Sequence, residues 1–179
     1  RLISGPEYMR LKTLADIQTA QFFIPKLKAG DCIVDGLFRE YLAGRAMQGQ
    51  AVAKAMAVAV EKRFFQWFLE FPEVMANGGF DCILGNPPFL GGKRISGRHG
   101  DDYLAYIKWN YAPASGGLDF VTYFFRRIFN LIKSNGFQSL IATNTISQGD
   151  TRKGGLDVII ELHGIINHAV KSLRWPGMA

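Results

Sequence analysis

Apolar side chains recur at helical spacing through the first part of the chain. Leu11, Leu14 and Ile17 are three residues apart, and the stretch from Ala46 to Phe65 is rich in Ala, Met and Val with few helix breakers. This spacing brings the apolar side chains to one face of a helix, where they can pack against a second helix. We therefore expect residues 1–75 to form a helical segment ahead of the first strand.

The second half of the chain alternates short apolar runs with helical patterns. The short runs predict strands, and the longer amphipathic stretches predict helices. In chain order they are a strand at Phe80–Leu84, a helix from Asp119 to Gly136, a strand at Phe137–Thr143, a helix at Gly155–Leu162 and a strand at Ile165–Val170. This order is typical of a mainly parallel sheet covered by helices. The predicted fold class is α/β, with an N-terminal helical segment.

The helix that follows Asp119 has sequence signals at both ends. Asp119 is a typical N-cap residue, and Gly136 is a typical C-cap residue. Its apolar stripe consists of Phe120, Phe124, Ile128 and Leu131. We expect the basic side chains on its other face, Arg126 included, to be solvated. The preceding stretch, Gly91–Gly117, is rich in Gly and charged residues and predicts a loop with a short helix at Asp102–Trp109.

The composition is that of a folded domain with a moderate excess of positive charge. Of 179 residues, 48% are hydrophobic and 13% are aromatic, which excludes a disordered chain. Lys and Arg total 21 against 15 Asp and Glu, and the net charge of +6 favours nucleic acid or another polyanion as a partner. The longest apolar stretch, Ala55–Val60, is far too short to span a membrane.

The cysteines and histidines are not spaced for a disulfide framework or a metal site. Cys32 and Cys82 lie far apart with no second pair, which fits free thiols in a reducing cytoplasm. Cys82 lies in the first predicted strand, where we expect it to pack in the core. His99, His163 and His168 share no ligand spacing with a Cys or a carboxylate, so no metal is expected. We expect a cytoplasmic protein whose first residue, an arginine, lies inside a longer reading frame.

The tetrapeptide Asn86-Pro87-Pro88-Phe89 directly follows the first predicted strand. In open α/β sheets, ligands bind beyond the carboxyl ends of the strands. The Asn86 side-chain oxygen and the Pro87 carbonyl can accept the two hydrogens of an amino group, which turns the nitrogen lone pair toward a methyl donor. Two prolines keep these acceptors rigid, and Phe89 offers a face on which a flipped base can stack. A strand-ending turn with Phe89 in the core explains the four residues alone equally well.

Basic side chains follow both of the first two predicted strands. Lys93, Arg94 and Arg98 come after the tetrapeptide, and Arg152 and Lys153 come after the second strand. At the ligand edge of a sheet, these side chains can hold the phosphates beside a flipped nucleotide, so they are the predicted DNA-binding residues. An ordinary solvated surface explains them equally well.

Longer stretches of sequence extend the pattern on both sides of the tetrapeptide. They are Phe64–Val74 (FFQWFLEFPEV), Gly78–Phe89 (GGFDCILGNPPF), Thr143–Arg152 (TNTISQGDTR) and Trp175-Pro176-Gly177. These stretches resemble the gamma-type N6-adenine DNA methyltransferases, most closely those of type IIG restriction-modification enzymes and of phage-exclusion systems. The resemblance covers roughly residues 60–179 and, more loosely, Leu11–Pro25.

The resemblance implies a Rossmann-like, S-adenosylmethionine-dependent domain that methylates the exocyclic amino group of a flipped adenine in DNA. It assigns the catalytic loop to Asn86, Pro87, Pro88 and Phe89. The family's cofactor loop, an aromatic-x-Gly-x-Gly turn, has no counterpart, because Gly-x-Gly occurs nowhere among the 20 glycines. We therefore expect residues 76–179 to be the C-terminal half of the catalytic domain, with a partial Rossmann-like sheet. Its expected partners are DNA and the remainder of a larger restriction-modification polypeptide.

Two alternative functions stay open on this sequence. The same tetrapeptide suits any planar nitrogen, so glutamine in a protein or guanine in RNA fits it as a methyl acceptor. A non-catalytic DNA-binding fragment of a restriction system also fits, because the cofactor loop is missing. The basic charge and the long flanking matches favour DNA as the substrate.

Overall fold

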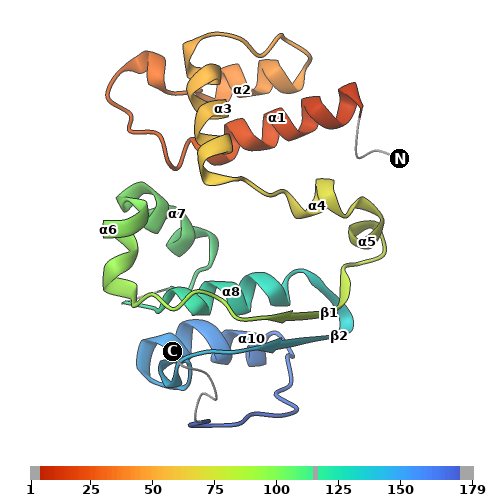
Figure 1. Ribbon diagram of the computed structural model, residues 1–179, viewed down its shortest axis with the longest axis vertical. Coiled ribbons are helices and arrows are strands. Elements are labelled where there is room, and N and C mark those ends of the chain that lie inside the picture. Colours follow the sequence, from red (N-terminus) through yellow and green to blue (C-terminus); the bar gives the residue numbers. More distant parts are fainter. Residues whose placement is uncertain (1–4, 115–116, 174–179) are drawn as a thin grey trace. The chain divides into compact units, whose positions relative to one another are not determined.

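The computed structural model describes residues 5–114 and 117–173 of the chain (Figure 1). The chain divides into two compact units, residues 1–77 and residues 78–179. The motif Trp175-Pro176-Gly177 lies outside the described residues. Across the described ranges, the helices are too short or too polar for any of them to cross a membrane.

The described part of the first unit consists of helices and the turns between them. The helices are α1 (Pro6–Ala20), α2 (Asp35–Leu42), α3 (Gln50–Lys62), α4 (Trp67–Glu70) and α5 (Pro72–Ala76), with a 3₁₀ turn at Ala29–Asp31. Proline in the first turns of α1 and α5 fits a helix start, where its missing N–H has no intrahelical partner. The helical character predicted from the apolar spacing is confirmed for these residues.

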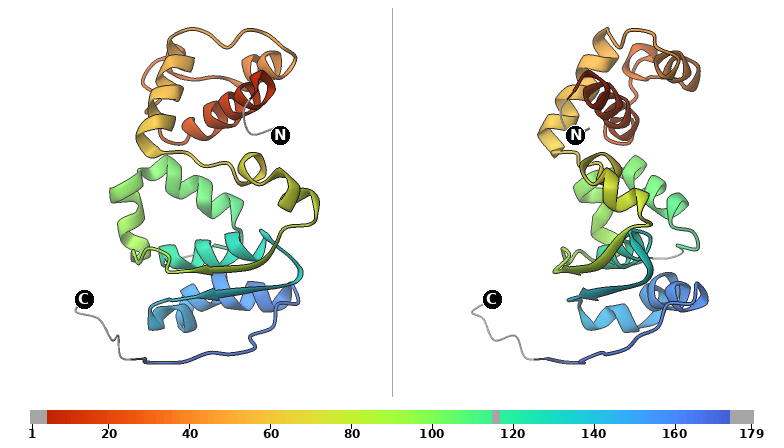
Figure 2. Two further views of the ribbon diagram at one scale, coloured as in Figure 1. Left: turned by 45° about the vertical axis from the view of Figure 1, so that its right-hand side comes forward. Right: turned by 90° about the vertical axis from the view of Figure 1, so that its right-hand side faces the viewer.

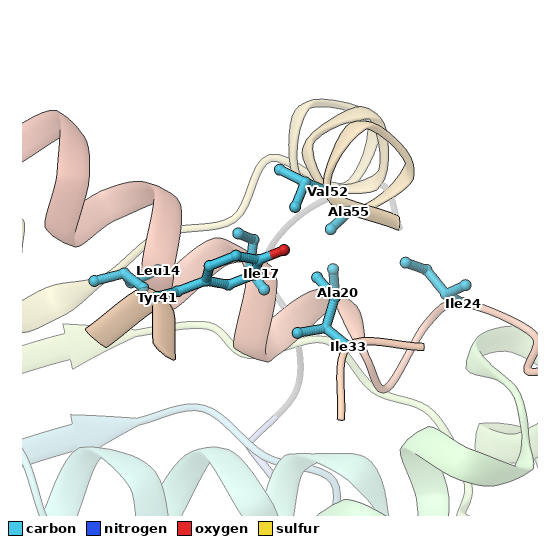
Figure 3. Close-up of a cluster of buried hydrophobic side chains, with 8 residues drawn as sticks. All are labelled: Leu14, Ile17, Ala20, Ile24, Ile33, Tyr41, Val52 and Ala55. Atoms are coloured by element: carbon cyan, nitrogen blue, oxygen red, sulfur yellow. The ribbon is translucent and has the colours of Figure 1, made fainter. Parts of the chain in front are cut away.

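The core of the first unit lies between α1, α2 and α3. Figure 3 shows its buried side chains, which are Leu14, Ile17, Ala20, Ile24, Ile33, Tyr41, Val52 and Ala55. Ile17, Ala20 and Ala55 are completely buried, so α1 and α3 can approach closely. Leu14 and Ile17 of the predicted apolar stripe therefore form a packing surface, whereas Leu11 is 37% exposed.

Polar contacts also join the helices of the first unit. Lys54 of α3 forms an ion pair with the buried carboxylate of Asp31. The Tyr8 hydroxyl of α1 donates a 2.8 Å hydrogen bond to the Glu70 carboxylate of α4. Within α1, the buried Asp16 carboxylate lies 2.5 Å from the ammonium nitrogen of Lys12. These contacts satisfy carboxylates that packing would otherwise leave costly to bury.

The second unit contains two parallel strands joined by helices. The strands are β1 (Phe80–Gly85) and β2 (Ile132–Leu140), which run side by side in Figures 1 and 2. Between them lie a 3₁₀ turn at Gly92–Arg94, α6 (Ile95–His99), α7 (Asp101–Asn110) and α8 (Phe120–Phe129). The α/β class is thus confirmed as a mixed helix and strand unit with a small parallel sheet, compatible with part of a methyltransferase fold.

The boundary between α8 and β2 differs from the sequence prediction. The helix begins after Asp119 as expected, but it ends at Phe129 instead of continuing to Gly136. Strand β2 begins at Ile132 and ends at Leu140, whereas Phe137–Thr143 was expected. An irregularity in the strand pairing explains the difference, because Phe80 pairs with Ile132 but Cys82 pairs with Phe137. The residues between them bulge out of the ladder, and Asn135 adopts a left-handed φ of 62° there.

The segment between β1 and α8 is mostly helical. The short helix predicted at Asp102–Trp109 is confirmed as α7, whereas the loop predicted before it is wrong, because those residues form the 3₁₀ turn and α6. Ile95 of α6 and Ile107 of α7 are buried with Leu118 and Phe120 in a second core. This core supplies the stability that the glycine-rich composition lacks, since tertiary packing overrides weak helix propensity.

Arg126 of α8 is not solvated as expected. Its guanidinium donates hydrogen bonds to the carbonyl oxygens of Tyr111, Ala112 at 2.9 Å and Gly154 at 3.3 Å. The guanidinium also stacks 5.6 Å from the centre of the Tyr111 ring. Arg126 therefore joins the end of α7 to the middle of α8 and to the segment after β2.

Two further predictions, a strand at Ile165–Val170 and a buried Cys82, are also wrong. Ile165–Val170 forms no strand, and Ile165 is 83% exposed. An apolar run becomes a strand only when a neighbouring strand completes its ladder, and the described residues provide none for this run. Cys82 is exposed instead of packed in the core.

The segment after β2 returns to helix, which agrees with the helix predicted at Gly155–Leu162. It consists of a 3₁₀ turn at Asn144–Ser147, α9 (Gly149–Arg152), a π-helical turn at Lys153–Asp157 and α10 (Val158–Glu161). Gly154 and Gly155 are buried in the π-helical turn. A Cβ atom at Gly154 would lie 2.3 Å from the Leu118 side chain, so only glycine allows this close approach to the second core.

Candidate functional site

The tetrapeptide Asn86–Phe89 lies directly after Gly85, the last residue of β1. Its residues have no regular secondary structure. Asn86 is exposed, Pro87 is buried, and Phe89 is 50% exposed. The alternative in which Phe89 is tucked into the core is therefore wrong. The amide of Asn86 and the ring of Phe89 thus face solvent, whereas Pro87 between them in the sequence is buried.

Backbone hydrogen bonds hold this segment at both of its ends. The Ile141 N–H donates to the Gly85 carbonyl at 3.1 Å, and the Phe120 N–H donates to the Leu90 carbonyl at 2.8 Å. Within the described ranges, residues 86–89 themselves form no hydrogen bond. The orientation of the tetrapeptide thus depends on what fixes its two ends.

A second group of polar side chains follows β2 on the same edge of the sheet. Thr143, Asn144 and Thr145 are exposed and come just after the strand. The carboxyl ends of two neighbouring parallel strands meet at one edge, so these residues and the tetrapeptide belong to the same region. The Thr143 and Thr145 hydroxyl oxygens are 2.7 Å apart and share a hydrogen bond.

The Asp119 carboxylate connects these segments, which the sequence did not reveal. One carboxylate oxygen accepts a 3.3 Å hydrogen bond from the Gly92 N–H, and the other accepts a hydrogen bond from the Thr145 hydroxyl. The sequence identified Asp119 only as an N-cap residue. Its side chain forms no capping hydrogen bond with α8, although its position at the helix start is as predicted.

The predicted DNA-binding residues lie on the surface near the ends of the two strands. Lys93, Arg94 and Arg98 are exposed on the 3₁₀ turn and on α6, directly after the tetrapeptide. Arg152 and Lys153 are exposed after β2. The Arg152 guanidinium nitrogen Nε lies 2.9 Å from the Asp157 carboxylate, so part of its charge is compensated. Solvent-exposed positions suit contact with phosphates.

The core behind the site contains tyrosines that stay neutral. Burial raises the pKa of Tyr103 to about 12, and burial also raises the pKa values of Tyr111 and Tyr123. The rings of Tyr103 and Tyr123 pack around Phe120. These tyrosines therefore add no negative charge beside α8 at neutral pH.

The described residues contain no group of three or more His, Cys, Asp or Glu side chains that could hold a metal ion. The prediction that the protein needs no metal stays a prediction. The arrangement offers hydrogen-bond acceptors, an exposed aromatic ring and basic side chains.

Comparison with protein families gives a match over most of the chain. The family model described as Eco57I restriction-modification methylase matches residues 31–166. The matched range includes the tetrapeptide, both strands and all five predicted DNA-binding residues. No curated protein and no solved structure matches the chain.

Proposed function

We propose that the chain, which belongs to the Eco57I restriction-modification methylase family of DNA methyltransferases, methylates adenine. The reaction transfers a methyl group from S-adenosylmethionine to the exocyclic amino group of a flipped adenine in DNA. The biological setting is a restriction-modification or phage-defence system. The observation that carries the proposal is the tetrapeptide at the end of β1, which exposes Asn86 and Phe89 while Pro87 is buried.

The proposed chemistry uses acceptors instead of a strong base. The amino nitrogen of adenine is a poor nucleophile because its lone pair is delocalised into the ring. When the Asn86 side-chain oxygen and the Pro87 carbonyl accept its two hydrogens, the nitrogen moves toward tetrahedral geometry and its lone pair becomes available. Pro88 limits the motion of the loop, and Phe89 stacks on the flipped base. S-adenosylmethionine would supply the methyl group through cleavage of its methyl–sulfur bond and would leave as S-adenosylhomocysteine, and the nitrogen would release one proton to solvent.

The described residues do not form a complete binding site for the methyl donor. A nucleoside cofactor in a Rossmann-like sheet is usually held by a glycine-rich turn after a strand, and Gly-x-Gly is absent from the chain. The two described strands end instead in Asn86–Phe89 and in Thr143–Thr145. No described residue is therefore assigned to S-adenosylmethionine. We also propose that the complete sheet is Rossmann-like.

The basic residues are proposed to hold the DNA backbone. Lys93, Arg94 and Arg98 follow the tetrapeptide closely enough in sequence to contact phosphates next to a flipped nucleotide, and Arg152 and Lys153 follow the neighbouring strand. Phosphate contacts position DNA and make binding depend on salt. Replacing Arg94 with Ala should reduce the slope of log K against log salt by about 1.

The test is a methylation assay with labelled S-adenosylmethionine and mixed-sequence DNA that carries no adenine methylation. The expected product is N6-methyladenine, identified after digestion to nucleosides. Asn86→Ala should lower the rate roughly 100-fold or more, because one prearranged acceptor is lost. Phe89→Ala should lower it about tenfold or more. Asn110→Ala, which changes an exposed asparagine at the end of α7, is the matched control and should keep the wild-type rate.

Other outcomes of this assay favour the alternative functions. Label in protein glutamine or in RNA guanine would replace DNA adenine as the substrate. Salt-sensitive DNA binding without methyl transfer, and without cofactor binding in a calorimetric titration, would favour a non-catalytic DNA-binding role. Either result would contradict the proposed reaction.

A further inference from the structure

Asp119 is an N-cap residue that does not cap its helix. Aspartate at this position usually accepts hydrogen bonds from the first N–H groups of the helix. Here the backbone of Asp119 is extended, with φ −63° and ψ 143°, and the side chain forms no hydrogen bond with α8. Both carboxylate oxygens accept hydrogen bonds from other segments of the chain, so the side chain does not stabilise the helix end.

The carboxylate joins the two loops that leave the sheet. It accepts a hydrogen bond from the Gly92 N–H at 3.3 Å and another from the Thr145 hydroxyl. Gly92 lies three residues after Phe89, and Thr145 lies five residues after the end of β2. The backbone N–H of Asp119 also lies 3.4 Å from the hydroxyl of the buried Thr151 and donates to it. One residue thus contacts both loops and the start of α9.

The backbone around Gly92 supplies a second, independent observation. A Cβ atom at Gly92 would lie 2.3 Å from the carbonyl carbon of Gly117 and 2.4 Å from the carbonyl oxygen of Leu118. Such distances are not tolerated, so the loop and the chain before Asp119 are in direct backbone contact. The Phe120 N–H also donates to the Leu90 carbonyl at 2.8 Å. The loop after Phe89 is therefore held at two points, Leu90 and Gly92.

We propose that Asp119 is a positioning residue, which fixes the Asn86–Phe89 loop relative to the loop that follows β2. The tetrapeptide forms no hydrogen bond of its own within the described residues, and its two prolines have no N–H to donate. Its orientation then follows from Gly85 at one end and from the contacts of Leu90 and Gly92 at the other. Asp119 provides the only side chain among the described residues that bonds to both loops. The inference rests on the proposed function, in which the orientation of Asn86 and Phe89 decides the reaction.

The test compares amide hydrogen exchange in the full chain for the wild type, Asp119→Ala and Asp119→Asn. In Asp119→Ala, the amides of Gly92 and Phe120 should exchange about tenfold faster. The Gly92 N–H loses its acceptor, and the hydrogen bond from the Phe120 N–H to the Leu90 carbonyl opens more often once the loop is no longer held at Gly92. The amides of Cys82–Gly85 and Phe137–Leu140 should keep their wild-type rates. Asp119→Asn should restore slow exchange, since its side-chain oxygen can accept from Gly92 and its amide can donate to Thr145.

Asp150→Ala is the matched control, because it removes an exposed aspartate from the first turn of α9. It should leave the exchange of Gly92 and Phe120 unchanged. If Asp119→Ala does not fold, Thr145→Val removes one of the two partners, and Gly92 should then exchange about threefold faster.

Three results would overturn the positioning role. The first is unchanged exchange at Phe120 in Asp119→Ala, or at Gly92 in Thr145→Val. The second is equal acceleration across β1, β2 and the loop, which would show a general loss of stability. The third is an Asp119→Asn variant that exchanges as fast as Asp119→Ala. These measurements need neither DNA nor a methyl donor, so they stay interpretable if the methylation assay fails.

Discussion

The guanidinium of Arg126 donates a 2.9 Å hydrogen bond to the carbonyl oxygen of Ala112, a residue 14 positions earlier in the chain. The same side chain reaches the carbonyl oxygens of Tyr111 and Gly154. Helix α8 thereby holds the chain that leads into it as well as the segment after β2.

Replacing Arg126 should destabilise the second unit. Arg126→Ala leaves several backbone carbonyls without their charged donor, which should cost about 2 kcal/mol or more. Arg126→Lys should recover part of the loss, because an ammonium group reaches fewer of these carbonyls. Urea unfolding followed by near-ultraviolet circular dichroism measures both. Arg98→Ala, on the exposed surface of α6, should change stability by less than about 0.5 kcal/mol, and an equal loss there would contradict the assignment.

Tyr103 should make folding sensitive to alkaline pH. Burial raises its pKa to about 12 in the folded protein, whereas an unfolded tyrosine ionises near pH 10. Its contribution to stability is complete below about pH 10 and is lost as the pH rises through about 12. Between about pH 8 and about pH 12, the thermal unfolding midpoint should therefore fall more steeply with rising pH in the wild type than in Tyr103→Phe. Identical alkaline curves would refute the prediction.

The Asp31–Lys54 pair should make the first unit sensitive to acid. The hydrogen bond from Lys54 holds the pKa of the Asp31 carboxyl below its ordinary range. Its contribution is present above the unfolded value of about 3.9 and is lost as the pH falls through the lowered folded value. Asp31→Asn should thus be less stable than the wild type at neutral pH, and the difference should shrink in acid. Asp35→Asn, which breaks an exposed pair with Arg39, is the control and should show little effect at either pH.

Gly79 should be essential for the start of the sheet. Its φ is +119°, and a Cβ atom there would lie 2.4 Å from the Leu131 carbonyl oxygen, next to the hydrogen bond that this oxygen accepts from Phe80. Gly79→Ala should cost about 2 kcal/mol or more. Gly97→Ala is the matched control, because Gly97 lies inside α6 with open space around it. That change should raise stability by up to about 1 kcal/mol. Equal effects of the two substitutions would show that the strain at Gly79 is absent.

The parts of the fold that were predictable from sequence are those with strong local signals. The run Phe80–Leu84, bounded by Gly85 and two prolines, predicted β1 almost to the residue. The N-cap Asp119 and the aromatic stripe after it predicted where α8 begins. The run at β1 carries its own stop signals and α8 carries its own start signal, so no knowledge of the neighbouring chain was needed at these boundaries.

The parts that sequence did not predict depend on contacts between distant residues. Helix α6 forms because Ile95 packs with Leu118 in the second core, a contact that local composition does not show. Strand β2 starts early because its residues bulge around the turn at Asn135. The candidate site follows the same rule: the tetrapeptide was visible as a motif, whereas the bonds of the Asp119 carboxylate appear only once two loops meet.

The π-helical turn at Lys153–Asp157 sets a limit on insertions and deletions in this part of the chain. A π-helical turn holds one residue more than an α-helical turn, so a single deletion would restore the α-helical path. The buried Val158 and Ile159 would keep their direction after that deletion, whereas the loss of a second residue would turn them by about 100° away from the core. The number of residues between Arg152 and Val158 is therefore constrained more tightly than their identity at exposed positions such as Lys153.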